Sequence, residues 1–302
     1  MFVFNVQDLK KMSHTDMTSF PLRSLGAAVE GVRDQYADGK AAQVWQAYIV
    51  DNKQRKKNYK EFLVGLLRQH GCKRILDVAC GTGVDSTMLL EEGFEVVSVD
   101  ASDKMLKYAL KTRWQRRKEP AFDNWIIEEA NWLTLEEDIK PLIGDGFDVV
   151  MCLGNSFAHI LDTHGDQREQ KQALANFERC VKPGGLLLID HRNYQSIIEK
   201  GQAPIQCMYY NNKYLKNIET SVIYKKGKPY LIALEYRVCL NESEDQTSEF
   251  RLAYYPHMLG EFTELLDKSF PKLAKHDIYG DFKPLEQIED PGFYIHVLEK
   301  AK

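Results

Sequence analysis

The chain has 302 residues, 44% of them hydrophobic, and a net charge of −4, so we expect one large domain or one domain with an insertion. That charge favours neither a nucleic-acid nor an anionic-membrane partner, and no run approaches the ~18 apolar residues of a membrane span. The six cysteines are scattered without a C-x-x-C pair, which argues against a metal site or a disulfide framework and favours a soluble, cytoplasmic protein with reduced thiols.

Alternating strands and helices are predicted over residues 34–192, after an extended N-terminal arm (1–33) that lacks periodicity. The helices are expected over residues 40–49, 56–70, 84–92, 102–114 and 167–181. The strands are expected over residues 74–79, 95–100, 125–129, 147–153 and 186–190, the last preceded by a turn at 183–185. This order predicts an α/β fold, with a doubly wound, mostly parallel, seven-stranded sheet.

After Arg192 the pattern changes. Segments over residues 221–225, 230–240 and 249–256 are rich in β-branched and aromatic residues, with no helix between them, and are predicted to be antiparallel strands. A helix over 260–269 and a last strand over 292–299 follow. We expect residues 193–245 to form a small β-rich lid that carries substrate contacts, and 246–302 to return to the core sheet. The lid contains many tyrosines, of which we expect only a minority to lie in a site.

A strand meets a helix at the turn formed by residues 79–83, with the sequence Ala-Cys-Gly-Thr-Gly. With Asp100 at the end of the next strand, this turn predicts a nucleotide-binding cradle. A pyrophosphate-binding G-x-G-x-x-G sequence has glycine where Ser86 stands, and Asp85 in the first helical turn repels phosphate. The pattern therefore opposes an NAD-dependent oxidoreductase and favours S-adenosylmethionine, which has no phosphate. The alternative is a tight turn that binds nothing.

Two acids flank this turn at positions that suit the charges of S-adenosylmethionine. Asp77 is expected to attract its ammonium group through the turn, while Gly81 lets the backbone approach the methionyl part. Asp100 can accept hydrogen bonds from both ribose hydroxyls.

Polar and aromatic residues also follow the other strands, whose carboxyl ends meet at one edge of a parallel sheet. Asn131 is expected to read the adenine edge and Trp132 to stack on it, although a core tryptophan is an equal alternative. Arg192 suits bidentate binding of a carboxylate, with Asn155 in reach of the same ligand. The alternative for Arg192 is an ion pair with a structural acid. His159 is expected to touch the cofactor.

The chain resembles the glycine N-methyltransferase family, a group of class I S-adenosylmethionine-dependent methyltransferases, from about residue 22 to residue 302. The segments that carry the resemblance are residues 23–26, 34–39, 76–86, 98–110, 128–133, 152–159, 183–187, 190–194 and 250–257. Residues 1–21 do not match, and the loop over 241–248 is shorter and more acidic than the family pattern.

The resemblance implies a role for each matching residue. Those implied to line the S-adenosylmethionine site are Tyr36, Trp45, Tyr48, Arg55, Ala79, Asp100, Asn131, Trp132, Leu153 and His159. Those implied to hold glycine are Gly154, Asn155, Arg192, Tyr210, Tyr236 and Tyr254. The resemblance also implies a homotetramer whose N-terminal arms reach into neighbouring active sites, and folate as an inhibitor.

The expected reaction is in-line displacement, in which the amine of glycine attacks the methyl group and gives sarcosine and S-adenosylhomocysteine. No general base stands among the strand ends, so catalysis should depend on alignment by Arg192 and Asn155, with Tyr36 steadying the sulfonium. Two alternatives remain: a methyltransferase for sarcosine, dimethylglycine or another small amine, and a regulatory protein that binds S-adenosylmethionine or folate with weak turnover.

Overall fold

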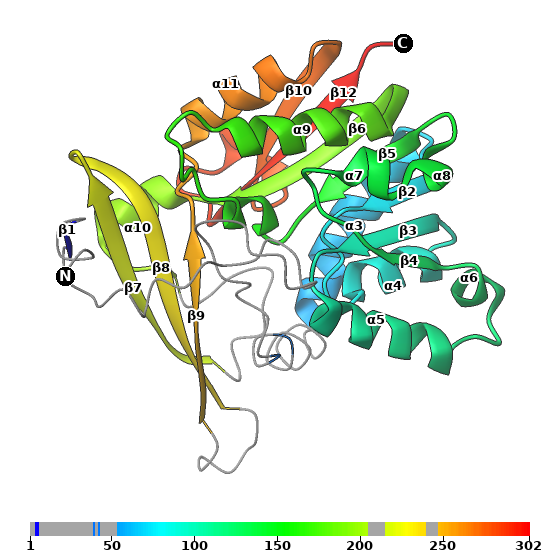
Figure 1. Cartoon of the computed structure of the whole chain (residues 1–302), viewed down its shortest axis with the longest axis horizontal. Coiled ribbons are helices and arrows are strands. Elements are labelled where there is room, and N and C mark those ends of the chain that lie inside the picture. The colour runs from blue at the N-terminus through cyan, green and yellow to red at the C-terminus, as the bar shows by residue number, and fades with distance from the viewer. Residues whose placement is uncertain (1–3, 6–38, 40–41, 43–52, 205–214, 240–246) are drawn as a thin grey trace.

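The computed structural model describes residues 4–5, 39, 42, 53–204, 215–239 and 247–302, which form two sheets (Figure 1). The larger sheet has the strand order β11-β10-β12-β6-β5-β2-β3-β4. Its strands are β2 (Arg74–Asp77), β3 (Glu95–Asp100), β4 (Ile126–Glu129), β5 (Phe147–Cys152), β6 (Val181–Arg192), β10 (Leu273–Gly280), β11 (Lys283–Pro284) and β12 (Phe293–Lys300). Strands β2 to β6 are parallel, and β12 and β10 add antiparallel strands beside β6. The predicted doubly wound, mostly parallel sheet is confirmed, with the two-residue β11 as an eighth strand.

Helices cover both faces of this sheet. They are α3 (Lys53–Gln69), α4 (Val84–Glu91), α5 (Asp103–Gln115), α6 (Pro120–Asp123), α7 (Leu135–Asp138), α8 (Lys140–Ile143), α9 (Arg168–Cys180), α10 (Tyr194–Lys200) and α11 (Leu259–Ser269). Two short 3₁₀ helices cover Ser156–His159 and Leu285–Gln287.

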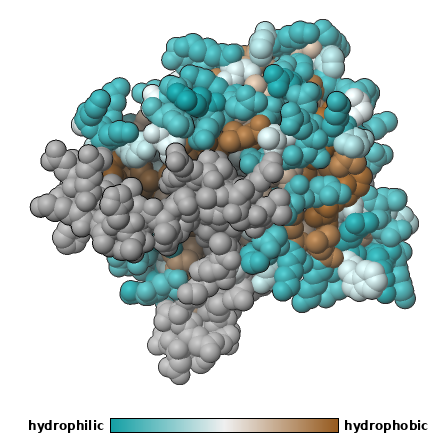
Figure 2. All heavy atoms as spheres, viewed as in Figure 1, coloured by the Kyte–Doolittle hydropathy of each residue, from teal (hydrophilic) through white to brown (hydrophobic). Residues whose placement is uncertain are grey.

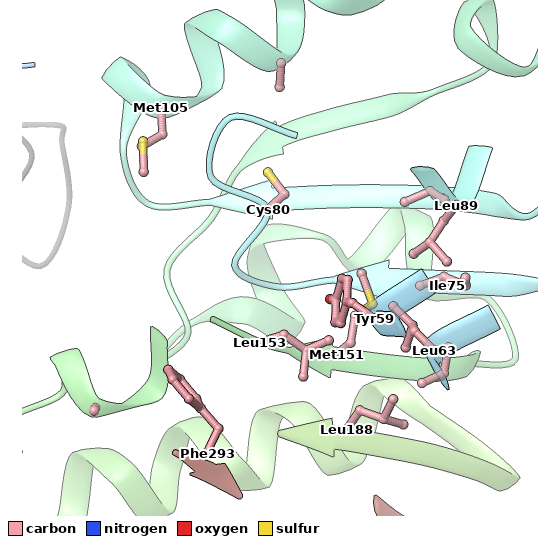
Figure 3. Close-up of a cluster of buried hydrophobic side chains, with 14 of the residues drawn as sticks. Tyr59, Leu63, Ile75, Cys80, Leu89, Met105, Met151, Leu153, Leu188 and Phe293 are labelled. Carbon is pink, nitrogen blue, oxygen red and sulfur yellow. The ribbon is translucent and has the colours of Figure 1, made fainter. Parts of the chain in front are cut away.

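Successive strand residues enter different hydrophobic clusters because side chains alternate across a sheet. Ile75 of β2 packs into the cluster that contains α3 and α4, whereas Leu76 packs into the one that contains α9 and α11. Figure 3 shows part of the first cluster, where Leu63 of α3 lies near Ile75 and Leu188. On the face shown in Figure 2 the described surface is mostly hydrophilic, as expected when apolar side chains fill these clusters.

The smaller sheet has the order β1-β7-β8-β9 and stands beside the core sheet (Figure 1). Its strands are β1 (Phe4–Asn5), β7 (Leu215–Lys225), β8 (Lys228–Cys239) and β9 (Thr247–Tyr254). Strands β7, β8 and β9 are antiparallel, as predicted. Strand β9 pairs with β8 and not with the core sheet, although we expected the return to the core from residue 246.

Several elements differ from the prediction, among them β6, α10 and β10. Strand β6 begins at Val181, which already pairs with Phe147, so the predicted turn at 183–185 lies within the strand. Helix α10 follows β6 directly, and the Asn193 side chain caps it by accepting a hydrogen bond from the Ser196 amide. Strand β10 was not predicted, because its polar residues give no clear apolar alternation.

Candidate active site

The glycine turn is held by Asp100 from the neighbouring strand. The Asp100 carboxylate accepts hydrogen bonds from the Gly81 amide at 2.8 Å and from the Ser102 amide at 2.9 Å. Gly83 has φ +80°, and a Cβ atom there would lie 2.7 Å from the Trp125 ring. Only glycine therefore fits at position 83. The hydrogen bond from Gly81 holds the turn against Asp100, the residue expected to bind ribose.

Asp77 lies beneath the turn, with 3% of its surface exposed. Its carboxylate accepts hydrogen bonds from the Ser86 hydroxyl at 2.8 Å and from the Ala79 amide at 3.3 Å. The network continues from Ser86 through Ser98 to the Trp125 indole. Burial raises the pKa of Asp77 to about 8, so its carboxyl is largely protonated at neutral pH in the free protein.

Trp132 and Asn131 follow β4 at the same edge of the sheet. The Trp132 indole donates a hydrogen bond to the Val78 carbonyl at 2.5 Å, and its ring stacks on Phe157. Trp132 is half-buried. It therefore packs partly as the core tryptophan that was the alternative prediction, and it keeps some exposed surface. The Asn131 side-chain oxygen accepts a hydrogen bond from the Leu133 amide and closes a local turn.

Arg192 lies at the end of β6, where only 1% of its surface is exposed. Its guanidinium donates a hydrogen bond to the Tyr236 hydroxyl at 3.3 Å and lies over the Phe293 ring, 5.0 Å from its centroid. Its backbone amide donates to the Asn155 side-chain oxygen at 2.9 Å. The two residues expected to hold a carboxylate are therefore in direct contact.

Asn155 is held by hydrogen bonds to three neighbouring residues, Asp190, Arg192 and Tyr194. Its backbone has φ +64°, and Asp190 accepts hydrogen bonds from the amides of Asn155 at 2.7 Å and Gly154 at 2.9 Å. The buried Tyr194 hydroxyl donates to the Asn155 side-chain oxygen at 2.9 Å. That oxygen thus accepts two hydrogen bonds, so the NH₂ group points the other way. Among the described residues, this buried NH₂ group has no hydrogen-bond partner, and it can donate to a ligand.

The smaller sheet supplies tyrosines to the same place. The hydroxyl groups of Tyr236 on β8 and Tyr254 on β9 lie 3.4 Å apart, and Tyr254 packs on the His159 ring with centroids 4.8 Å apart. Burial lowers the pKa of His159 to about 4, so this ring is neutral at physiological pH. The candidate site therefore lies where the two sheets meet.

Sequence reasoning missed the roles of Asp190 and Tyr194. Both act on Asn155 through hydrogen bonds between separate elements, which no local pattern reveals. Tyr36, Trp45, Tyr48 and Tyr210 lie outside the described residues, as does the side chain of Arg55 in α3. Leu153 and Ala79, implied to line the cofactor site, lie at the ends of β5 and β2.

Within the described part of the chain, no group of three or more His, Cys, Asp or Glu residues is arranged to hold a metal ion. The cysteines there (72, 80, 152, 180 and 239) are buried thiols without disulfides. None of the described helices is both long and apolar enough to cross a membrane.

The chain is similar to known methyltransferases. Residues 69–248 match the family described as a methyltransferase domain. The chain is 58% identical to glycine N-methyltransferase of Mus musculus over 286 residues, which cover 92% of this chain and 97% of the relative. It is 33% identical to glycine/sarcosine N-methyltransferase of Parasynechococcus marenigrum over 83% of this chain and 80% of the relative.

A solved structure shows the fold independently. The CcbJ methyltransferase from Streptomyces caelestis has a TM-score of 0.62 over 89% of this chain and 100% of its own, at 14% sequence identity. At this identity the similarity concerns the fold alone.

Proposed function

The chain belongs to the glycine N-methyltransferase family, and we infer from this membership that it transfers the methyl group of S-adenosylmethionine to the amine of glycine. The products are sarcosine and S-adenosylhomocysteine. The observation that best fits glycine as the acceptor is the contact between Arg192 and Asn155, two buried donors at one strand edge. A small carboxylate is the ligand that these donors suit.

In the proposed arrangement, the Arg192 guanidinium and the Asn155 NH₂ group bind the glycine carboxylate. The Arg192 side chain is hydrogen-bonded to Tyr236 and the Asn155 side chain to Tyr194. Both are therefore ordered before glycine binds, and the conformational entropy lost on binding is small. Fixing the carboxylate aims the neutral amine at the methyl carbon. Positive charge moves from the sulfonium to the new ammonium, and alignment of this kind can contribute about 7–11 kcal/mol.

The glycine turn and its flanking residues are proposed to hold the methyl donor. Asp100 is proposed to accept hydrogen bonds from the ribose hydroxyls, and Asn131 and Trp132, which follow the neighbouring strand β4, are proposed to bind the adenine. Asp77 is buried beneath the turn and protonated in the free protein, so we propose that the ammonium group of the bound cofactor favours its ionised form and that Asp77 then acts by charge and not by direct contact. Tyr36, Trp45, Tyr48, Arg55 and Leu153 are proposed to complete the cofactor site, and Gly154 and Tyr210 the glycine site.

Replacing Arg192 with lysine tests this proposal. Lysine keeps the charge but loses the fork that binds a carboxylate in bidentate fashion, so kcat/KM for glycine should fall by about tenfold or more. The affinity for S-adenosylhomocysteine should be unchanged. Arg179→Lys, at an exposed ion pair with Glu136, is the matched control and should keep full activity. A fall of less than about threefold in Arg192→Lys would show that the carboxylate binds elsewhere.

Glycine/sarcosine N-methyltransferases are more distant relatives, at 33% identity, and they define the second candidate function. Incubation with labelled S-adenosylmethionine and either glycine or sarcosine separates the two functions. With a glycine-specific enzyme, sarcosine accumulates and dimethylglycine does not form. Rapid formation of sarcosine also excludes a regulatory protein with weak turnover.

We further propose a homotetramer in the cytoplasm that folate inhibits, on the strength of the family resemblance. Sedimentation equilibrium measures the subunit number, and glycine methylation in the presence of a reduced folate measures the inhibition. A monomer, or full activity at saturating folate, would contradict the respective part.

A further inference from the structure

Three histidines form a continuous hydrogen-bonded chain behind the candidate active site. They lie on the adjacent strands β10, β12 and β6, at His276, His296 and His191 (Figure 1). The His276 Nε2 and His296 Nδ1 atoms are 2.9 Å apart, and the His296 Nε2 and His191 Nε2 atoms are 3.1 Å apart. At the outer end His276 Nδ1 contacts the Asp267 carboxylate at 2.7 Å. At the inner end His191 Nδ1 contacts the Arg192 carbonyl at 2.8 Å.

The number of hydrogen bonds in this histidine chain determines how many protons it must hold. It contains four hydrogen bonds, and both of its ends, a carboxylate and a carbonyl, are acceptors. Each bond requires one proton, whereas three neutral imidazoles carry only three. With ionised Asp267, all four bonds can form only if the histidines hold one proton more than their neutral forms.

The extra proton belongs at the outer end. Burial lowers the pKa of His191 to about 4 and that of His296 well below its ordinary value, so both inner rings are neutral. Asp267 is 47% exposed and stands against His276, where its negative charge balances an imidazolium. His276 then donates to Asp267 and to His296, His296 donates through Nε2, and His191 donates through Nδ1 to the Arg192 carbonyl.

We propose that this chain, protonated at His276, positions Arg192 for carboxylate binding, so that His276, His296 and His191 are positioning residues. The inference rests on the proposed role of Arg192 in binding glycine. If the proton leaves, the chain must reverse or break, and in the reversed form a lone pair of His191 faces the Arg192 carbonyl 2.8 Å away. That contact is repulsive and displaces the end of β6. The displacement reaches the site because the Arg192 amide there donates the hydrogen bond to the Asn155 side chain.

Other titratable groups lie beside the histidine chain on this face. His257 lies beside His191, and burial lowers its pKa well below the ordinary value, so it stays neutral. Burial raises the pKa of Tyr294, which packs on His191 and stays protonated. The charged residues that flank His276 on β10, Lys275 and Asp277, form an ion pair with each other. Ion pairs also join Lys268 to Glu264 on α11, the helix of Asp267, and Lys300 of β12 to Glu178.

The proton count can be read directly from the free enzyme by long-range ¹⁵N–¹H correlation of ¹⁵N-histidine-labelled protein. At about pH 7 we expect His276 to carry protons on both nitrogens, His296 on Nε2 and His191 on Nδ1. Single His→Gln variants assign the signals. A neutral His276, or a proton on Nε2 of His191, overturns the proposal without any reference to catalysis.

Inhibition by acetate tests the positioning role, because acetate carries the carboxylate of glycine without an amine that titrates. In the wild-type enzyme the acetate inhibition constant should rise about three- to tenfold over the pH range in which the ¹⁵N signals show that the histidine chain loses its proton. In Asp267→Asn this rise should occur at lower pH, since the balancing charge is gone. In His276→Gln, which cannot titrate, the rise should disappear.

His70→Gln is the matched control, because His70 is an exposed histidine just after α3 whose ring contacts the Leu66 carbonyl. Its acetate profile should follow the wild type. A wild-type profile in His276→Gln, or no pH dependence in the wild type, overturns the positioning role. If acetate does not compete with glycine at any pH, the proposed carboxylate site is wrong instead, whereas the ¹⁵N signals still decide the protonation of the chain.

Discussion

The hydrogen bonds around the Asn155 side chain leave only its NH₂ group to bind a ligand. Its oxygen accepts hydrogen bonds from the Arg192 amide and the Tyr194 hydroxyl, and Asp190 holds its backbone in the left-handed region. Burial raises the pKa of the Tyr194 phenol, so this hydroxyl stays a donor. The orientation of the Asn155 amide is therefore determined, and its NH₂ group is committed to the ligand.

Asn155→Asp should strongly weaken carboxylate binding while preserving the surrounding structure. The oxygen that accepts from Arg192 and Tyr194 is retained, but the donor becomes an acceptor and faces a substrate carboxylate. We expect KM for glycine to rise by roughly 100-fold, equivalent to about 3 kcal/mol, with the affinity for S-adenosylhomocysteine unchanged. Steady-state kinetics at saturating S-adenosylmethionine measure this. An unchanged KM would place the substrate carboxylate away from Asn155.

Asp77 makes the stability of the free protein depend on pH. The native state keeps a proton up to the pKa of about 8, while the unfolded chain releases it near the ordinary value of 3.8. The unfolded state therefore binds fewer protons in this window, and the free energy of unfolding falls as pH rises from about 4 to about 8, by on the order of 5 kcal/mol. Asp77→Asn should lack this decrease. Urea unfolding of both proteins at several pH values measures it, and parallel profiles would contradict the prediction.

At the scale of an element, the turn can require glycine for two reasons: its backbone conformation and the space available for a side chain. Two glycines of the chain separate these reasons. Gly83 and Gly93 both have positive φ, at +80° and +86°. A Cβ atom at Gly83 would lie 2.7 Å from the Trp125 ring and 3.0 Å from the Ala109 side chain, whereas nothing lies within 4 Å at Gly93. Gly93→Ala should therefore cost about 1–2 kcal/mol from backbone strain alone.

Gly83→Ala should cost about 2–5 kcal/mol, because overpacking is added to the same strain. It should also weaken S-adenosylhomocysteine binding, while Gly93→Ala should not. Chemical denaturation and isothermal calorimetry on the two variants measure both effects. Equal losses of stability would mean that the turn tolerates a side chain against Trp125.

The elements that could be predicted are those whose apolar pattern is local. Strand β3 was predicted with its observed bounds, and the Ser102 cap of α5 was recognised, because both depend on a few consecutive residues. Strand β10 contains Lys275, His276 and Asp277, so its pairing with β12 depends on tertiary contacts that no periodicity reports. Its histidine contributes to the chain behind Arg192, which is why that chain was also invisible in the sequence.

At the scale of the whole molecule, the site could be predicted only in part. The ends of parallel strands converge, so Asp100, Asn155 and Arg192 could be expected at one edge of the sheet. The contact of Tyr236 and Tyr254 with that edge requires the docking of a second sheet, which spacing does not encode and which only the family resemblance implied.

Because the second sheet contributes to the site, a carboxylate should stabilise both sheets together. S-adenosylhomocysteine alone should slow hydrogen exchange near the ends of β2 and β3. Addition of acetate should then slow exchange at Tyr236 and Tyr254 as well as at Arg192, since the three side chains are linked by hydrogen bonds. With acetate at 100 times its Kd, opening events that release it should become roughly 100-fold rarer, or about 2.7 kcal/mol less favourable. Hydrogen exchange read by mass spectrometry resolves the peptides concerned. Protection confined to β6 would mean that the smaller sheet stands beside the site without closing it.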